Sequence, residues 1–152
     1  HILGNMLFLW IFGNNVEDAL GRVRFLLWYL VAGLAATATQ TFVTLQFGDA
    51  AAASIPNIGA SGAVSGVLGA YLLLHPTASV LTLFGWIPIQ VPAFLYLGFW
   101  FLFQLVVGGF SFVQPQAGGG VAYFAHVGGF AFGLAAVKIF AAGRPRPLRP
   151  SY

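Results

Sequence analysis

Apolar residues gather in five long stretches, which short segments rich in glycine, proline and polar residues separate. A helix needs about 20 residues, each rising 1.5 Å, to cross roughly 30 Å of hydrocarbon. The pattern therefore predicts an all-α protein, a polytopic bundle of transmembrane helices. The predicted membrane segments cover residues 1–12, 25–47, 61–74, 89–107 and 121–140. The predicted loops cover residues 13–24, 48–60, 76–88 and 108–120.

The composition agrees with a bilayer as the solvent. Hydrophobic residues make up 59% of the 152 residues and charged residues only 6%, and the mean hydropathy is +0.89. A soluble domain has about a quarter charged residues. The net charge of +3 is too small to indicate a nucleic-acid partner, and the absence of cysteine excludes disulfides and thiolate metal sites. We expect the lipid bilayer as a partner, with no nucleic acid, metal or cofactor.

The basic residues predict an orientation. They lie only in the first predicted loop and near the C-terminus: Arg22, Arg24, Lys138, Arg144, Arg146 and Arg149. Four predicted spans separate the two groups, so both face the same side, which the positive-inside rule assigns to the cytoplasm. We expect a membrane domain over residues 1–142, a flexible cytoplasmic tail over residues 143–152, and a location in a prokaryotic cell membrane. His1 opens inside an apolar stretch without an initiator Met, which predicts a truncated chain.

Several polar residues fall at a similar predicted depth. The segment that begins at Ser61 covers only about 21 Å, so its N-terminus would stop inside the membrane. The non-helical residues 54–60 before it are tolerated there only if they are buried or line a water-filled cavity. His126 lies about six residues into its span, and His1, with Asn5 one turn further along, lies at a comparable height. These four polar side chains could share one cavity that opens outward.

Each of these residues also has a purely structural interpretation. Ser61 could be a small packing residue, whereas an ionisable residue such as His126 inside a span is functional by default. Two stripes of small residues allow close helix packing: Gly62, Gly66 and Gly69, and Ala125, Gly129 and Gly133. If these stripes face each other, Ser61 and His126 come within reach, and a Ser–His contact is the minimal arrangement that activates a hydroxyl nucleophile. Gln40 and Gln104 are interpreted as hydrogen-bonding groups between helices, and His75 as an interfacial residue.

Three motifs resemble those of the rhomboid family of intramembrane serine proteases. His1-Ile-Leu-Gly-Asn5 resembles the family's HxxxN motif, and Gly59-Ala-Ser-Gly62 its GxSG motif. Ala125-His-Val-Gly-Gly129, with Gly133 one turn later, resembles its AHxxGxxxG motif. The glycines that support the site would be Gly59, Gly62, Gly129 and Gly133. Because the family has a six-helix core, the chain resembles helices two to six, with the first helix upstream.

The resemblance implies an activity and residue roles. Ser61 would be the nucleophile and His126 the general base and acid of a dyad, acting on peptide bonds in or near transmembrane segments of a membrane protein substrate. His1, Asn5 and the backbone N–H of Ser61 would form the oxyanion hole. One position departs from the family, which usually has an aromatic residue four positions after the serine, packed on the histidine. Here that position is Ser65.

Two other classes of protein remain open. The first is a catalytically silent rhomboid-like protein that binds or chaperones transmembrane helices; such relatives usually lack the serine or the histidine. The second is a channel or transporter with His126 in its pathway. That class favours inverted repeats, and the chain shows no internal symmetry.

Overall fold

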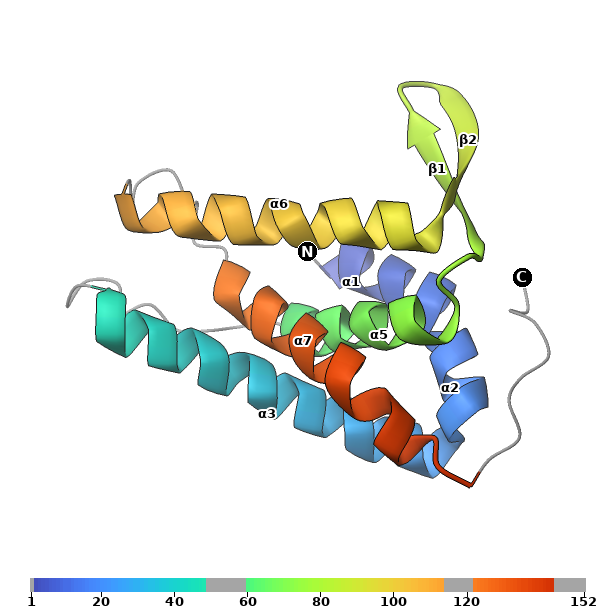
Figure 1. Cartoon of the computed structure of the whole chain (residues 1–152), viewed down its shortest axis with the longest axis horizontal. Coiled ribbons are helices and arrows are strands. Elements are labelled where there is room, and N and C mark those ends of the chain that lie inside the picture. The colour runs from blue at the N-terminus through green and yellow to red at the C-terminus, as the bar shows by residue number, and fades with distance from the viewer. Residues whose placement is uncertain (1, 49–59, 114–121, 144–152) are drawn as a thin grey trace.

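The computed structural model describes residues 2–48, 60–113 and 122–143. The elements in chain order are α1 Ile2–Phe8, the π-helical segment η1 Leu9–Gly13, α2 Asn14–Leu20, α3 Arg22–Phe47, α5 Ser61–Leu74, β1 Ser79–Phe84, β2 Ile87–Pro92, α6 Ala93–Val113 and α7 Tyr123–Phe140. Helices α3 and α6 run roughly along the long axis of the molecule, α7 crosses it obliquely, and α5 packs against all three (Figure 1). The predicted all-α helical bundle is confirmed.

Within the described residues, three helices are long and apolar enough to cross a membrane. They are Arg22–Phe47, Ala93–Phe110 and Tyr123–Phe140. Their outward faces carry large exposed apolar side chains, such as Leu34, Phe99 and Ile139. Such surfaces suit hydrocarbon, because lipid tails are as apolar as these side chains.

The short helix α5 forms the centre of the bundle. It has the predicted bounds, Ser61–Leu74, and every residue from Gly62 to Tyr71 is buried. Its 14 residues span about 21 Å and the 26 residues of α3 about 39 Å. The N-terminus of α5 consequently stops short of the ends of α3 and α6 (Figure 1). This arrangement places Ser61 inside the bundle.

Backbone-to-backbone packing joins α5 to α7. A Cβ atom built on Gly129 would overlap the carbonyl oxygen of Gly62, and one built on Gly133 would overlap that of Gly66. One turn further on, a Cβ atom on Gly69 would overlap the carbonyl of Phe130. The two small-residue stripes therefore face each other over three successive levels, as transmembrane small-xxx-small packing requires. We call this contact the α5–α7 seam.

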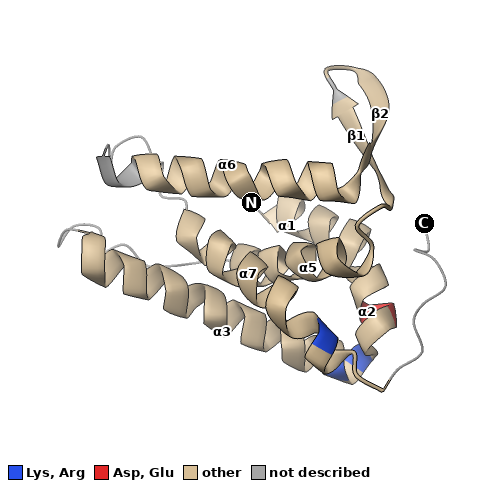
Figure 2. Cartoon of the chain, viewed as in Figure 1, with Lys and Arg blue, Asp and Glu red and all other residues tan. Residues whose placement is uncertain are grey.

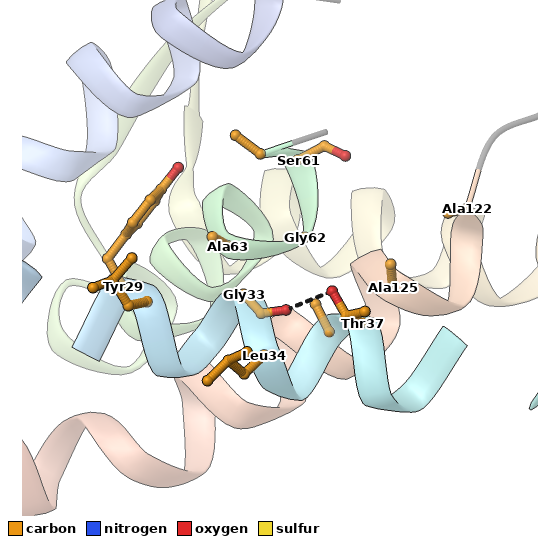
Figure 3. Close-up of a pocket in the computed structure, with 12 residues that line it drawn as sticks. Tyr29, Gly33, Leu34, Thr37, Ser61, Gly62, Ala63, Ala122 and Ala125 are labelled. Carbon is orange, nitrogen blue, oxygen red and sulfur yellow. Dashed lines mark hydrogen bonds between the residues drawn. The ribbon is translucent and has the colours of Figure 1, made fainter. Parts of the chain in front are cut away.

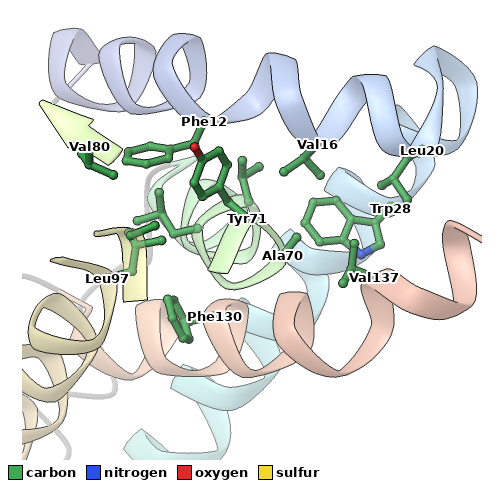
Figure 4. Close-up of a cluster of buried hydrophobic side chains, with 13 residues drawn as sticks. Phe12, Val16, Leu20, Trp28, Ala70, Tyr71, Val80, Leu97, Phe130 and Val137 are labelled. Carbon is green, nitrogen blue, oxygen red and sulfur yellow. The ribbon is translucent and has the colours of Figure 1, made fainter. Parts of the chain in front are cut away.

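A hydrophobic cluster fills the interior of the bundle (Figure 4). Phe12 packs edge-on against Tyr71, with ring centroids 4.9 Å apart. Trp28 of α3 is fully buried and stacks near Phe25 of the same helix. The cluster contains residues of η1, α2, α3, α5, β1, α6 and α7, so it fixes these elements relative to one another.

Two segments differ from the predicted loops. Residues 13–20 are helical, because Val16, Ala19 and Leu20 recur at helical spacing and are buried against the core. Residues 79–92 form an antiparallel hairpin, paired from Ser79 with Pro92 to Phe84 with Ile87, and α6 begins after it at Ala93. Gly85 has a φ of 63° in the two-residue turn, where glycine is favoured. The predicted membrane segment 89–107 thus merged the second strand with the helix that follows it.

The described charges gather at one end of the bundle (Figure 2). Arg22 forms an ion pair with Glu17 at 3.2 Å. Arg24 Nη1 donates hydrogen bonds to the carbonyls of Phe140, at 3.2 Å, and Ala142, at 3.0 Å. These bonds join the start of α3 to the end of α7, where unpaired carbonyls favour a cation. Arg144, Arg146 and Arg149 lie outside the described residues.

Candidate active site

Ser61 and His126 are hydrogen-bonded to each other. Ser61 is the first residue of α5, and His126 lies in the first turn of α7. His126 Nε2 is 2.9 Å from Ser61 Oγ. The α5–α7 seam sets this distance, because it begins one residue after Ser61, at Gly62, and continues along the face of α7 below His126.

The other ring nitrogen of His126 contacts a residue of α6. Its Nδ1 atom is 2.9 Å from Gln104 Oε1, and Gln104 is only 6% exposed. An amide oxygen can only accept a hydrogen bond, so in this orientation Nδ1 carries the proton. Nε2 is then an acceptor that faces the Ser61 hydroxyl. This is the tautomer that a general base requires.

Aromatic rings surround His126 as well. The ring of Trp100, one turn before Gln104 on α6, has its centroid 6.0 Å from that of His126 with an interplanar angle of 34°. Tyr123 approaches edge-on at 6.5 Å. Trp100 also contacts Phe130, at 6.0 Å, so its ring packs along α7.

Ser65 bonds to the backbone of its own helix. It is buried, and its Oγ donates a hydrogen bond of 2.7 Å to the backbone carbonyl of Ser61. This i to i−4 bond is a common way for serine to be satisfied inside a helix. The position where the family usually has an aromatic residue thus contributes a backbone contact, and the aromatic contact to His126 comes from α6.

The start of α7 is held by a residue of α3. Gln40 Oε1 accepts a 3.1 Å hydrogen bond from the backbone N–H of Ala125, and Gln40 Nε2 donates to Thr44 Oγ1 at 3.1 Å. The first backbone N–H groups of a helix lack partners within that helix. The N–H of Ala125 also donates to the carbonyl of Ala122, at 3.1 Å, so Gln40 is its second acceptor and joins the turn that carries His126 to α3.

A cavity of about 250 Å³ lies beside Ser61 (Figure 3). Its walls come from α3 and from the first turns of α5 and α7, and most of the residues that line it are small. The lining residues are Tyr29, Leu30, Gly33, Leu34, Ala36, Thr37, Ala60, Ser61, Gly62, Ala63, Ala122 and Ala125. Ser61 therefore borders a hollow between helices, and His126 is not among the residues that line it.

The predicted oxyanion residues are only partly described. His1 and the motif residue Gly59 lie outside the described residues. Asn5 lies on α1, is partly exposed, and forms no hydrogen bond with another described residue. The structure therefore places Ser61 and His126 together but gives Asn5 no bond to either of them. Within the described parts of the chain, no group of three His, Cys, Asp or Glu residues is arranged to hold a metal ion.

Gln104 and Trp100 had no specific role in the sequence-based prediction. Gln104 was interpreted only as a hydrogen-bonding group between helices. The available signal was a polar residue inside an otherwise apolar span, which indicates a buried partner without naming it. The i, i+4 spacing of Trp100 and Gln104 was a second signal, since it places both on one helix face.

Two known proteins resemble this chain along most of its length, and a third resembles nearly half of it. Rhomboid protein 1, mitochondrial, of Saccharomyces cerevisiae is 32% identical over 136 residues, covering 88% of this chain and 36% of that protein. RHOMBOID-like protein 1 of Arabidopsis thaliana is 32% identical over 157 aligned positions, covering 100% of this chain and 32% of that protein. Rhomboid protease GluP of Bacillus subtilis is 42% identical over 72 residues, covering 47% of this chain and 12% of that protein. The chain thus spans little more than a third of these relatives at most. No solved structure matches.

The comparisons also bear on location and family. The relatives come from a bacterium, a yeast and a plant, and the yeast protein is named as mitochondrial, so they give no support to the expected prokaryotic membrane. The model of the Rhomboid domain matches residues 1–143. That match covers nearly the whole chain and includes the Ser61–His126 pair. The chain is an integral membrane protein and belongs to the rhomboid family.

Proposed function

We propose that this chain is the core of a serine endopeptidase that cleaves peptide bonds in or near the transmembrane segments of membrane proteins. The 2.9 Å contact between Ser61 Oγ and His126 Nε2 supports this proposal more than any other observation. A hydroxyl beside a base that is itself oriented by a third group is the arrangement that activates a nucleophile. Among the relatives, GluP is named a protease.

The geometry supports a two-step reaction. His126 Nε2 accepts the proton of Ser61 as Oγ bonds to the substrate carbonyl carbon, forming a tetrahedral intermediate. The same proton then passes from Nε2 to the leaving amine nitrogen as the peptide bond breaks. In the second step water attacks the acyl-enzyme, His126 again accepts and returns the proton, and Ser61 is released.

The developing oxyanion requires hydrogen-bond donors. The backbone N–H of Ser61 lies at the start of α5, where the first N–H groups have no partner within the helix. The resemblance to the family adds His1 and Asn5 as side-chain donors. Each donor of this kind typically contributes about 10²–10³-fold to the rate.

The position of the site suits a substrate from the membrane. Ser61 lies at the recessed end of α5 beside the cavity between α3, α5 and α7 (Figure 1). The orientation expected from the basic residues would make this recessed end face away from the cytoplasm. The substrate would then be a transmembrane segment whose scissile bond lies near its outer end.

Labelling of the full-length protein with a serine-directed fluorophosphonate tests the proposal. We expect labelling of the wild type and its loss in Ser61→Ala and His126→Ala. Ser79→Ala, which changes a serine of β1 outside the site, is the control and should be labelled normally. Labelling of all three variants at the level of the wild type would exclude Ser61 as the nucleophile.

A catalytically silent protein that binds transmembrane helices is the second candidate function. The names of the yeast and plant relatives state no proteolytic activity. Binding of helices needs neither a serine hydroxyl nor a histidine with its proton on Nδ1. If the full-length wild type retains a co-expressed transmembrane segment without cleaving it and resists labelling, this second function would replace the first.

A further inference from the structure

Two residues of α6 contact the His126 ring. Gln104 Oε1 contacts Nδ1 at 2.9 Å, and the ring of Trp100 lies 6.0 Å from the imidazole at an angle of 34°. We propose that Gln104 and Trp100 are positioning residues, which fix the tautomer and the ring orientation of His126 for its reaction with Ser61. This inference rests on the proposed protease function and adds two residues to its site.

Gln104 decides which nitrogen of His126 carries the proton. A neutral imidazole has two tautomers, and a solvated one exchanges between them. With Oε1 of a buried amide against Nδ1, the Nδ1–H tautomer gains a hydrogen bond and the other loses one. Nε2 then presents its lone pair to Ser61 Oγ, 2.9 Å away. The choice of tautomer therefore follows from one contact with α6.

Trp100 supplies the aromatic contact that Ser65 cannot make. The Ser65 hydroxyl is bonded to the carbonyl of Ser61 within α5, so it does not reach the histidine. Trp100 approaches the ring from α6 instead and is itself packed against Phe130 of α7. Because Trp100 and Gln104 are four residues apart, a single face of α6 holds both the ring plane and the tautomer of His126.

Among the described residues, the groups that form hydrogen bonds or ring contacts with His126 are uncharged. Their side chains are Ser61, Gln104, Trp100 and Tyr123. The described acidic residues, Glu17 and Asp18, lie on α2 at the far end of the bundle (Figure 2). An amide orients the imidazole without placing an anion in a region where burial of a charge is costly.

Substitution of Gln104 tests this inference in the full-length protein, with a fluorophosphonate as the probe. Gln104→Met keeps the length of the side chain and removes the acceptor. We expect its limiting labelling rate to fall about 10- to 10²-fold, because the base is no longer held in place, while the half-saturating probe concentration stays the same. Gln46→Met, at an exposed position of α3, is the matched control and should label at the wild-type rate.

Gln104→Glu separates positioning from packing. A carboxylate still accepts from Nδ1–H, so the labelling rate should exceed that of Gln104→Met. It also stabilises the imidazolium, so a more alkaline medium is needed to leave His126 neutral. The acid limb of the rate–pH profile should therefore move to higher pH. The shifted limb shows that residue 104 contacts the imidazole, and a labelling rate close to that of the wild type at pH values above the limb shows that an acceptor at this position is enough to hold the ring. Neither readout requires Gln104→Met to fold.

Nitrogen NMR of ¹⁵N-histidine-labelled protein reads the tautomer without any activity. We expect the His126 signals, assigned by their loss in His126→Ala, to show Nδ1–H in the wild type and a mixture in Gln104→Met. An unchanged tautomer, labelling rate and pH limb in both Gln104 variants would overturn this inference. Absence of labelling in the wild type, together with the expected tautomer, would instead contradict the proposed function.

Trp100 is tested in the same assays. Trp100→Phe retains an aromatic ring and should label at a rate close to that of the wild type, whereas Trp100→Leu should label several-fold more slowly with its tautomer unchanged. Equal rates in the two variants would exclude Trp100 as a positioning residue.

Discussion

The carbonyl oxygen of Gly62 occupies the place where a side chain on Gly129 would begin. The backbones of α5 and α7 therefore touch at this level, one residue away from Ser61. The contact has both a structural and a chemical role, because the same approach that packs the helices sets the distance between Ser61 and His126.

Gly129→Ala should separate the two helices. The added methyl group meets backbone, which has no rotamer by which to move aside, so we expect a loss of about 1–3 kcal/mol in the free energy of unfolding. Fluorophosphonate labelling should fall as well, because Ser61 and His126 move apart. Thermal unfolding in detergent measures the first effect and labelling the second.

Gly98→Ala is the matched control for this substitution. Gly98 lies in α6, and a Cβ atom built there has no neighbour within 4 Å. Alanine is favoured over glycine in a helix by roughly 0.5–1 kcal/mol. This variant should be as stable as the wild type or more so, and a loss equal to that of Gly129→Ala would contradict the seam as the cause.

Gln40→Leu should weaken the first turn of α7. It removes one of the two acceptors of the Ala125 N–H, which also donates to the carbonyl of Ala122, and a hydrogen bond of this kind typically contributes about 0.5–1.5 kcal/mol. We expect a lower unfolding temperature and faster hydrogen exchange at Ala125. Gln46→Leu, at an exposed position of the same helix, should change neither quantity.

Arg24→Gln should loosen the end of α7. Its guanidinium bonds two carbonyls there, at Phe140 and Ala142, and a cation at a helix C-terminus typically contributes about 0.3–1 kcal/mol. Arg22→Gln removes an ion pair in which the arginine side chain is 92% exposed, so it should leave the unfolding temperature unchanged. Equal effects of the two substitutions would contradict the specific role of Arg24.

His75 should make stability depend on pH. Burial lowers the pKa of its imidazole, and a hydrogen bond with the backbone of Asn15 raises it by less. Its Nε2 is buried and has no hydrogen-bond partner among the described residues. Because the folded-state pKa lies below the unfolded value of about 6.5, the unfolded chain binds the proton more readily.

The stability supplied by neutral His75 is therefore complete above about pH 6.5 and declines as the pH falls toward the lowered pKa. Unfolding temperatures between about pH 5 and pH 8 should show this decline in the wild type. His75→Asn should flatten the curve, and an equal slope in the variant would assign the effect to another group.

The positions of α5 and of its seam could be predicted from the sequence. The Ser61–Leu74 segment was predicted with its observed bounds, and the small residues on α5 and α7 indicated which faces meet. Glycine carries this information because a stripe of glycines along a span marks the face on which a second backbone can approach closely. The contact between Ser61 and His126 follows from the pairing of these faces.

The role of α6 could not be predicted in the same way. Its residues are almost uniformly apolar, so hydropathy does not distinguish the face toward the bundle from the face toward lipid. The hairpin of residues 79–92 was not predicted for a related reason. Its second strand is apolar and directly precedes an apolar helix in the sequence, so hydropathy indicates one continuous span. Residues 13–20 were missed because their asparagines and acidic residues mask the buried positions Val16 and Leu20.

The residues of the site lie on two parts of the bundle, the α5–α7 seam and the helix α6. Ser61 and His126 lie on α5 and α7, whose backbones are in contact, whereas Gln104 and Trp100 lie on α6. If α6 moved away from the bundle, Ser61 and His126 would stay in contact. The Nδ1–H group of His126 would then lose its hydrogen-bond acceptor, Gln104. The reactivity of Ser61 would then depend on the distance between α6 and α7.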